Sequence, residues 1–203
     1  MKFNLKLFAF ALVALVASTT FADDRLQFGD IDQPEFFPIL PWNSFTRKGQ
    51  TNKGTNGLES VAQCYFNMAP FVSPKDLPLC RQLGLGAIVY SESKFPSLKS
   101  FRGRENAGPE IDAWVENMVK SCDDNPAVKG FFIMDEPGVN DFPMLARAVA
   151  AVKKFAPGKF TYINLFPDYA TIGAPDKSQL GTSNYTEYLE RFVNEVKPPF
   201  LSY

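Results

Sequence analysis

The sequence predicts an α/β protein in which parallel strands alternate with helices, on the plan of an incomplete (β/α)8 TIM barrel. Short apolar runs alternate along the 203-residue chain with segments whose apolar residues recur at helical spacing, a pattern typical of βαβ units. The connections from helix to strand are short, whereas those from strand to helix are long and polar. This asymmetry favours a barrel over a doubly wound open sheet, because barrel enzymes build their sites from the loops that follow the strands.

The first half of the chain supplies three expected strands and two expected helices. The strands are apolar or aromatic runs at residues 36–43, 65–71 and 86–91. Helices are expected at 57–64 and 73–84. The second of them contains Pro78, which conflicts with a continuous helix, so its regular part is expected to begin near Asp76.

The helix expected at 109–122 has the clearest periodicity. Its apolar stripe consists of Ile111, Trp114, Val115, Met118, Val119 and Cys122. A strand follows at 129–134. Asp141 is expected to cap the next helix, whose stripe consists of Leu145, Ala148, Val149, Val152 and Phe155.

The last part of the chain repeats this pattern with a strand at 160–166 and a helix at 185–196. Asn184 and Glu187 have the spacing of a capping box. The apolar stripe of this helix consists of Tyr185, Tyr188, Leu189, Phe192, Val193 and Val196. Residues 200–203 begin a further strand.

These elements amount to five βα units and the start of a sixth. A full barrel takes eight units over ~250 residues, so residues 23–203 are expected to form a partial barrel domain that stops before strands seven and eight. The alternative is an open sheet that ends at Tyr203. No G-x-G-x-x-G or phosphate-binding G-x-x-x-x-G-K-[ST] motif follows any expected strand, which removes the usual signature of nucleotide-binding sheets.

Residues 1–22 have the features of a signal peptide. Lys2 and Lys6 precede a short apolar run, and small residues lead to Ala22. We expect cleavage after Ala22 and a secreted or periplasmic protein without stable membrane association. An uncleaved membrane anchor is the alternative.

The composition excludes several function classes. The chain has no histidine, which excludes Ser-His-Asp and Cys-His catalysis and zinc held by histidine. Its net charge of -1 predicts no nucleic-acid partner. Cys64, Cys80 and Cys122 match no metal motif, and we expect them to be buried thiols on apolar faces, at least one of them unpaired within the chain. No metal and no cofactor is expected.

Two adjacent carboxylates end the apolar strand in KGFFIMDEPG, residues 129–138. Because successive side chains of a strand point to opposite faces, only one of Asp135 and Glu136 is expected to point into a barrel. A carboxyl group in a partly desolvated site suits a general acid. On the Asp-Glu pair alone, a solvated strand end is the favoured interpretation.

The longer phrase, residues 129–137, resembles strand four of the clan A glycoside hydrolases, the barrel group that includes cellulases and the family 42 β-galactosidases. In that group the general acid/base is a Glu at the end of strand four, commonly followed by Pro. The expected strand order places Glu136 at the same point. The resemblance therefore implies an exported, retaining glycoside hydrolase, or its N-terminal portion, that acts on an oligosaccharide or polysaccharide.

The resemblance also implies residues that this chain lacks or replaces. The group usually has Asn before the acid/base, where it binds the sugar 2-hydroxyl, and this chain has Asp135. The nucleophile of the group is a second Glu at the end of strand seven, so the 203-residue chain alone is expected to be inactive. The expected substrate-binding residues are Trp42, Asn67, Tyr90, Asp135, Asn164 and Tyr203.

Two other functions are compatible with the sequence. Glu92, Glu136 and Asp168 follow three successive expected strands and could hold Mg²⁺ in a lyase, although no Lys or His base stands at the ends of strands two or six. The third possibility is a non-catalytic barrel that binds glycans.

Overall fold

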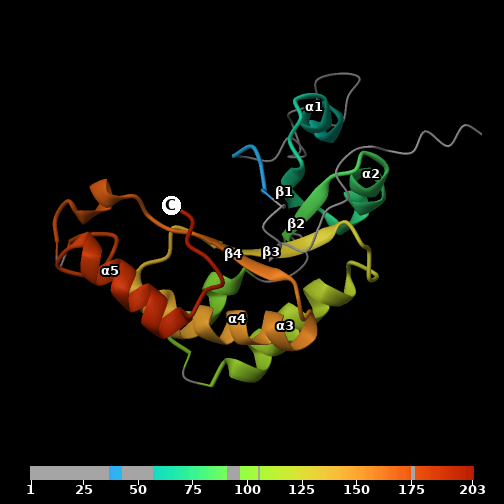
Figure 1. Ribbon diagram of the computed structural model, residues 1–203. Coiled ribbons are helices and arrows are strands. Elements are labelled where there is room, and N and C mark those ends of the chain that lie inside the picture. The colour runs from blue at the N-terminus through green and yellow to red at the C-terminus, as the bar shows by residue number, and fades with distance from the viewer. Residues whose placement is uncertain (1–36, 43–56, 91–96, 105, 175–176) are drawn as a thin grey trace, which may run out of the picture.

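The computed structural model describes residues 37–42, 57–90, 97–104, 106–174 and 177–203, and these form an α/β fold around a four-stranded parallel sheet (Figure 1). The strands lie side by side in chain order: β1 (Met68–Val72), β2 (Gly86–Tyr90), β3 (Val128–Asp135) and β4 (Phe160–Asn164). A parallel bridge between Asn164 and Ser202 places the last residues beside β4. The alternation of parallel strands with helices, predicted from the periodicity, is confirmed.

Helices connect the strands. The α-helices are α1 (Gly57–Gln63), α2 (Leu77–Gln82), α3 (Gly108–Lys120), α4 (Phe142–Phe155) and α5 (Tyr185–Arg191). Shorter elements are the 3-10 helices η1 (Pro74–Asp76), η2 (Leu98–Phe101), η3 (Val139–Asp141) and η4 (Asp168–Thr171), and the π-helical turn η5 (Phe192–Val196). The two longest helices, α3 and α4, pack against each other below the sheet in the view of Figure 1.

All five α-helices pack on one face of the sheet. The core there combines their apolar stripes with the strand residues that point the same way, such as Ala87, Val89 and Phe131. The opposite face, here called the helix-free face, carries a separate cluster of Met68, Ile88, Phe160 and Tyr162, and Leu40, Phe132 and Phe200 pack against it. None of these seven residues belongs to a described helix. Strands in chain order with helices on one face are wound in a single direction, unlike a doubly wound sheet.

The strand predicted at 36–43 is wrong for its described part, so Glu136 follows the third described strand, β3, and not a fourth strand as expected. Residues 37–42 form no regular element, because Pro38 and Pro41 have no backbone N–H to give to a ladder. The segment nevertheless lies beside the start of β1, where the backbone N–H groups of Asn67 and Met68 both donate to the Ile39 carbonyl at 3.1 Å.

The strand predicted at 65–71 begins too early. Tyr65 and Phe66 belong to the turn that ends α1, where their N–H groups donate to the carbonyls of Ala62 and Val61. Tyr65 has a φ of 62° and is 91% exposed. Aromatic residues favour strands on average, but here the completion of the helix end decides the backbone conformation.

The two longest predicted helices are confirmed, and their stripes are mostly buried. Trp114 is 6% exposed in the core, as expected. Asp141 stands at the start of α4, but its carboxylate makes no cap bond to the helix. The capping box at α5 is confirmed in a shifted form, in which Asn184 accepts from the Glu187 N–H while Glu187 accepts from the N–H of Ser183.

The last helix departs from its predicted stripe at η5. Its buried residues are Tyr188, Phe192 and Val196, which are spaced four apart rather than three and four. A π-helical turn holds more residues per turn than an α-helix. Val193, predicted on the stripe, is therefore 46% exposed.

The three cysteines are free thiols. Cys80 and Cys122 are buried as predicted, whereas Cys64 is exposed because it lies just after α1 at the turn. Residues 1–22, the predicted signal peptide, lie outside the described residues. Among the described residues, no helix is long and apolar enough to cross a membrane.

Candidate active site at the carboxyl edge of the sheet

A β-bulge in β3 decides which carboxylate points to the helix-free face. Phe132 pairs with Tyr162 and Met134 with Ile163, so Ile133 is an extra residue in β3. Ile133 and Met134 both enter the helix-covered core. The alternation of the strand is thereby shifted, and Asp135, which pairs with Asn164, points to the helix-free face.

A chain of hydrogen bonds joins the ends of β3, β4 and the last segment. The Asn164 Nδ2 donates to Asp135 Oδ1 at 3.0 Å. The Ser202 Oγ lies 3.1 Å from Asn164 Oδ1 and 3.0 Å from the phenol oxygen of Tyr162. Because a serine hydroxyl has a single proton, Ser202 can donate to Asn164 while accepting from Tyr162. The amide of Asn164 is thus oriented with its N–H group toward the carboxylate.

Tyr162 is held in its protonated form. Burial raises the pKa of its phenol, and the negative charge of Asp135 raises this pKa further, against a lowering by the hydrogen bond to Ser202. The neutral phenol keeps the proton that it donates to Ser202, so this end of the sheet carries neutral hydrogen-bonding groups around the Asp135 carboxylate.

Glu136 lies immediately beyond the strand. Its backbone is left-handed with a φ of 48°, and its N–H donates to the Asn164 carbonyl at 2.8 Å. Its side chain is exposed. The next residue, Pro137, accepts a hydrogen bond at 2.7 Å through its carbonyl from the buried Tyr188 hydroxyl. Burial raises the pKa of Tyr188, and neighbouring charges that include Glu136 make smaller contributions in the same direction.

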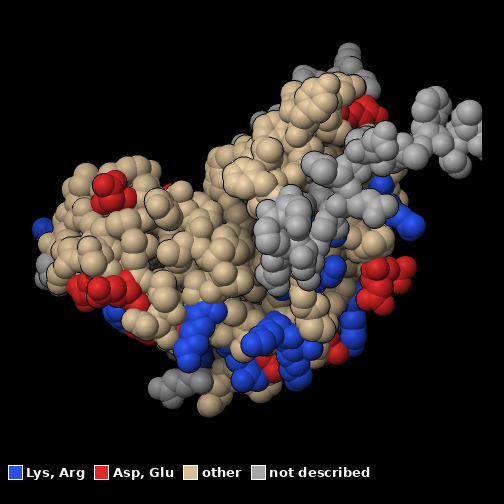
Figure 2. Space-filling view, viewed as in Figure 1, with Lys and Arg blue, Asp and Glu red and all other residues tan. Residues whose placement is uncertain are grey.

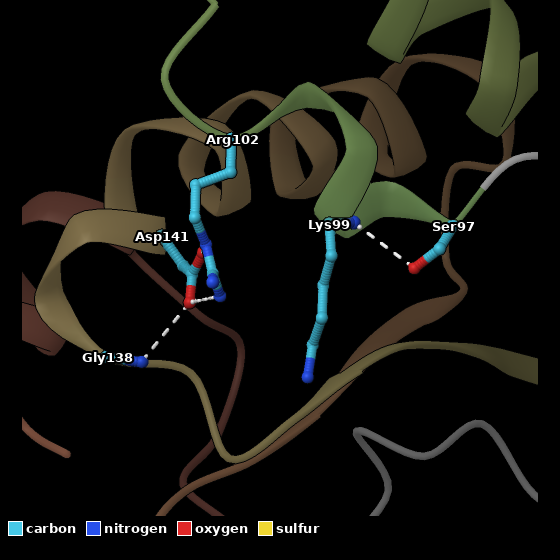
Figure 3. A network of polar contacts seen from close by, with 5 residues as sticks. All are labelled: Ser97, Lys99, Arg102, Gly138 and Asp141. Atoms are coloured by element: carbon cyan, nitrogen blue, oxygen red, sulfur yellow. Dashed lines mark hydrogen bonds and ion pairs between the residues drawn. The ribbon is translucent and has the colours of Figure 1, made fainter.

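A bidentate ion pair fixes the loop that carries Glu136. Arg102, just after η2, donates to both carboxylate oxygens of Asp141 at 2.6 and 2.8 Å, and Asp141 also accepts from the Gly138 N–H at 3.3 Å (Figure 3). Asp141 is 2% exposed. The hydrogen bond to Asp141 raises the pKa of Arg102. This Arg102–Asp141 clamp joins the loop after β2 to the loop after β3.

The loop after β4 is packed against the same place. The Val139 N–H donates to the Leu180 carbonyl at 3.0 Å. A Cβ on Gly138 would lie 2.7 Å from the Gln179 carbonyl oxygen, and one on Gly181 would lie 2.8 Å from Val139. These two glycines permit the close approach, so the loops after three strands hold one another around Glu136.

Aromatic rings cross the helix-free face in a row. Consecutive ring centroids are 5.5, 4.5, 6.0 and 5.8 Å apart along Trp42, Phe71, Phe132, Tyr162 and Phe200. Trp42 ends the row and is 55% exposed. Figure 2 shows a hollow between the α5 side and the α1 side of the molecule, whose visible walls are mostly uncharged. Such an aromatic and neutral surface suits a ligand with little charge.

The structure brings only part of the predicted site together. Asp135 and Asn164 are hydrogen-bonded, and Tyr203 follows Ser202 with 76% of its surface exposed. Tyr90 ends β2 and pairs with Phe132. Asn67 instead precedes β1 at the amino edge, where its side chain binds the backbone of Phe37 and Ile39.

No group of three or more His, Cys, Asp or Glu in the described residues could hold a metal ion. Glu92, one of the three carboxylates of the lyase hypothesis, lies outside the described residues. Asp168 begins η4, is exposed, and follows β4 by several residues.

Phe71, Phe132, Tyr162 and Ser202 were missed by sequence reasoning. The signal for Tyr162 was available, because it stands two residues before Asn164 and therefore shares its face. The other signals were hidden by the bulge in β3 and by an irregularity in β1 between Ala69 and Val72.

Comparisons with known proteins return no matching family model, no matching curated protein and no matching solved structure.

Proposed function

We propose that this chain is an exported carbohydrate-active protein with a (β/α)8-type barrel plan, in which Glu136 serves as the general acid/base for cleavage of a glycosidic bond. The observation that carries the proposal is the position of Asp135, Glu136 and Pro137 at the carboxyl edge of a parallel sheet wound in a single direction. Barrel enzymes carry their catalytic groups at this edge. The neutral aromatic surface beside these residues supports a sugar ligand, since sugars stack on aromatic rings and bind neutral polar groups.

In this proposal the three polar groups have different tasks. Glu136 is exposed on a loop that the Arg102–Asp141 clamp holds in place, so it can reach a glycosidic oxygen and protonate it. Asp135 and Asn164 are fixed by their mutual hydrogen bond and would bind sugar hydroxyls. The resemblance to the clan A hydrolases assigns the nucleophile to another strand.

An external nucleophile can test Glu136 without the second carboxylate. Azide would attack the anomeric carbon of an aryl glycoside, the bond from that carbon to the aglycone oxygen would break, and Glu136 would give its proton to the leaving phenol. We expect the 203-residue chain to show no hydrolysis by itself but to form a glycosyl azide when azide is added. Glu136→Gln should abolish azide product for poor leaving groups and preserve part of it for activated ones, which need little protonation.

Asp135→Asn is the matched control, because it removes the neighbouring carboxylate and keeps the hydrogen-bonding shape. We expect azide product to persist in this variant. Loss of product in Asp135→Asn with persistence in Glu136→Gln would transfer the acid role to Asp135. Calorimetric binding of a neutral oligosaccharide without any azide product would favour a glycan-binding barrel without catalysis.

A further inference from the structure

We propose that the opposite, amino-terminal end of the helix-free face holds a second binding site, for an amphipathic carboxylate of the fatty-acid class. A cavity of about 650 Å³ lies there, within the ~300–1,000 Å³ typical of ligand pockets. Its lining includes Met68 and Phe160, which begin β1 and β4, and also Val149 and Lys153 of α4, so the cavity extends to the helix beside β4. The candidate active site lies at the carboxyl ends of the same strands, and Tyr162 and Phe200 belong to both, so the two sites adjoin on one face of the sheet.

The floor of the cavity is apolar. It consists of side chains from three strands and the two flanking segments: Leu40, Met68, Ile88, Phe160, Tyr162 and Phe200. Five of these six have no polar side-chain atom other than sulfur. The sixth, Tyr162, turns its hydroxyl to Ser202. Burial of an alkyl chain on such a floor is favourable in proportion to the apolar area removed from water.

Two glycines make this floor possible. A Cβ on Gly86 would lie 2.5 Å from the Met68 sulfur, and a Cβ on Gly130 would lie 2.7 Å from the Phe160 ring. The side chains of Met68 and Phe160 can therefore extend over the neighbouring strands, where they spread apolar surface across the floor.

The charged residues that line the cavity are all cationic. Lys153 comes from the last turns of α4, Lys159 directly precedes β4, and Lys197 follows η5. No Asp or Glu is among the described residues that line the cavity. Three lysines from three elements thus line an apolar cavity of a protein whose net charge is -1. This complementarity selects a ligand with an apolar body and one anionic end.

Calorimetric titration of the full chain with decanoate, octanoate and decanol, each below its aggregation concentration, tests the site. We expect decanoate to bind about fifteenfold more tightly than octanoate, because each of its two additional buried methylenes contributes about fourfold. We expect Lys159→Glu and Lys197→Glu each to weaken decanoate by about tenfold through charge repulsion and to leave decanol unchanged. Lys154→Glu, one residue from Lys153 but outside the cavity lining, should leave both ligands unchanged.

Three outcomes would overturn the proposal. Decanol binding as tightly as decanoate would show that the cavity binds apolar chains without recognising the carboxylate. Equal weakening by Lys154→Glu and Lys159→Glu would show a general charge effect. A decanoate-insensitive dimer in sedimentation, with no heat of binding, would show that a second copy of the chain occupies the cavity. Since none of these variants alters Asp135 or Glu136, the azide experiment remains independent of this one.

Discussion

Cys64 and the two buried cysteines show how strongly position decides the chemistry of one residue type. Cys64 is exposed after α1, whereas Cys80 and Cys122 are in the core. Burial, with a smaller contribution from the charge of Asp76, raises the pKa of Cys80 to about 12, and burial raises that of Cys122 to about 11. A buried thiol of this kind stays protonated near neutrality, and the thiolate is the reactive form.

Alkylation at pH 8 should therefore modify Cys64 alone in the folded protein and all three thiols in urea, as counted by intact mass. Cys64→Ser should lose the native adduct. Because folding raises the pKa of two thiols above the ordinary value of 9.0, their contribution to stability is complete below pH 9 and decreases as the pH rises through 11 to 12. Native modification of Cys80 or Cys122 at the rate of Cys64 would contradict the packing of α2 and α3.

At the scale of elements, Gly130 shows what a single missing side chain permits. It lies in the middle of β3, and a Cβ there would approach the ring and the carbonyl oxygen of Phe160 to 2.7 Å. We expect Gly130→Ala to lower the free energy of unfolding by about 1–3 kcal/mol, as overpacking does. Gly108→Ala, whose nearest atoms are 3.7 Å away on Arg147, should instead be neutral or stabilising by up to ~1 kcal/mol. Urea denaturation of both variants measures the contrast, and similar losses in the two would disprove the steric argument.

The elements with long, regular periodicity were predicted best. The stripes of α3 and α4 appear in the sequence because an amphipathic helix must bury one side. The segment 36–43 was predicted wrongly because its prolines weigh against pairing more than its apolar residues favour it. Tyr65 was predicted in a strand because aromatic residues favour strands, whereas the end of α1 sets its backbone conformation.

The candidate site was only partly predictable for a related reason. The carboxyl edge and its Asp135, Glu136 and Asn164 follow from strand positions alone. The direction in which Asp135 points depends on the extra residue Ile133, and a bulge has no signature in a single sequence. The clamp between Arg102 and Asp141 joins residues 39 positions apart, which is beyond any local pattern.

At the scale of the whole molecule, the Arg102–Asp141 clamp is an ion pair between described residues whose loss should lower stability strongly, because Asp141 is buried. Arg102→Ala would leave the carboxylate of Asp141, 2% exposed, without its cation. We expect a loss of about 2–3 kcal/mol, since an uncompensated buried charge costs ~3–5 kcal/mol and Arg102 itself is half-exposed. For a chain of this size that loss corresponds to a Tm lower by roughly 4–12 °C.

The control for the clamp is Arg191→Ala, which breaks the pair with Glu195, whose partners are 39% and 38% exposed. Calorimetry should show a change of at most ~0.5 kcal/mol there. The double variant Arg102→Ala with Asp141→Asn should recover part of the stability, because it removes the buried negative charge that has lost its cation. A clamp variant as stable as the control would show that water screens Asp141 despite its burial.

The strand order along the sheet bears on how the polypeptide folds during its synthesis. Each of β2, β3 and β4 pairs with the strand that precedes it in the chain, so β1 and β2 can associate before β3 and β4 have left the ribosome. The loops that must close are those of one βα unit at a time, which keeps the entropic barrier of each step small. Assembly can therefore proceed in the direction of synthesis, with each newly added strand using the edge of the last one as its template.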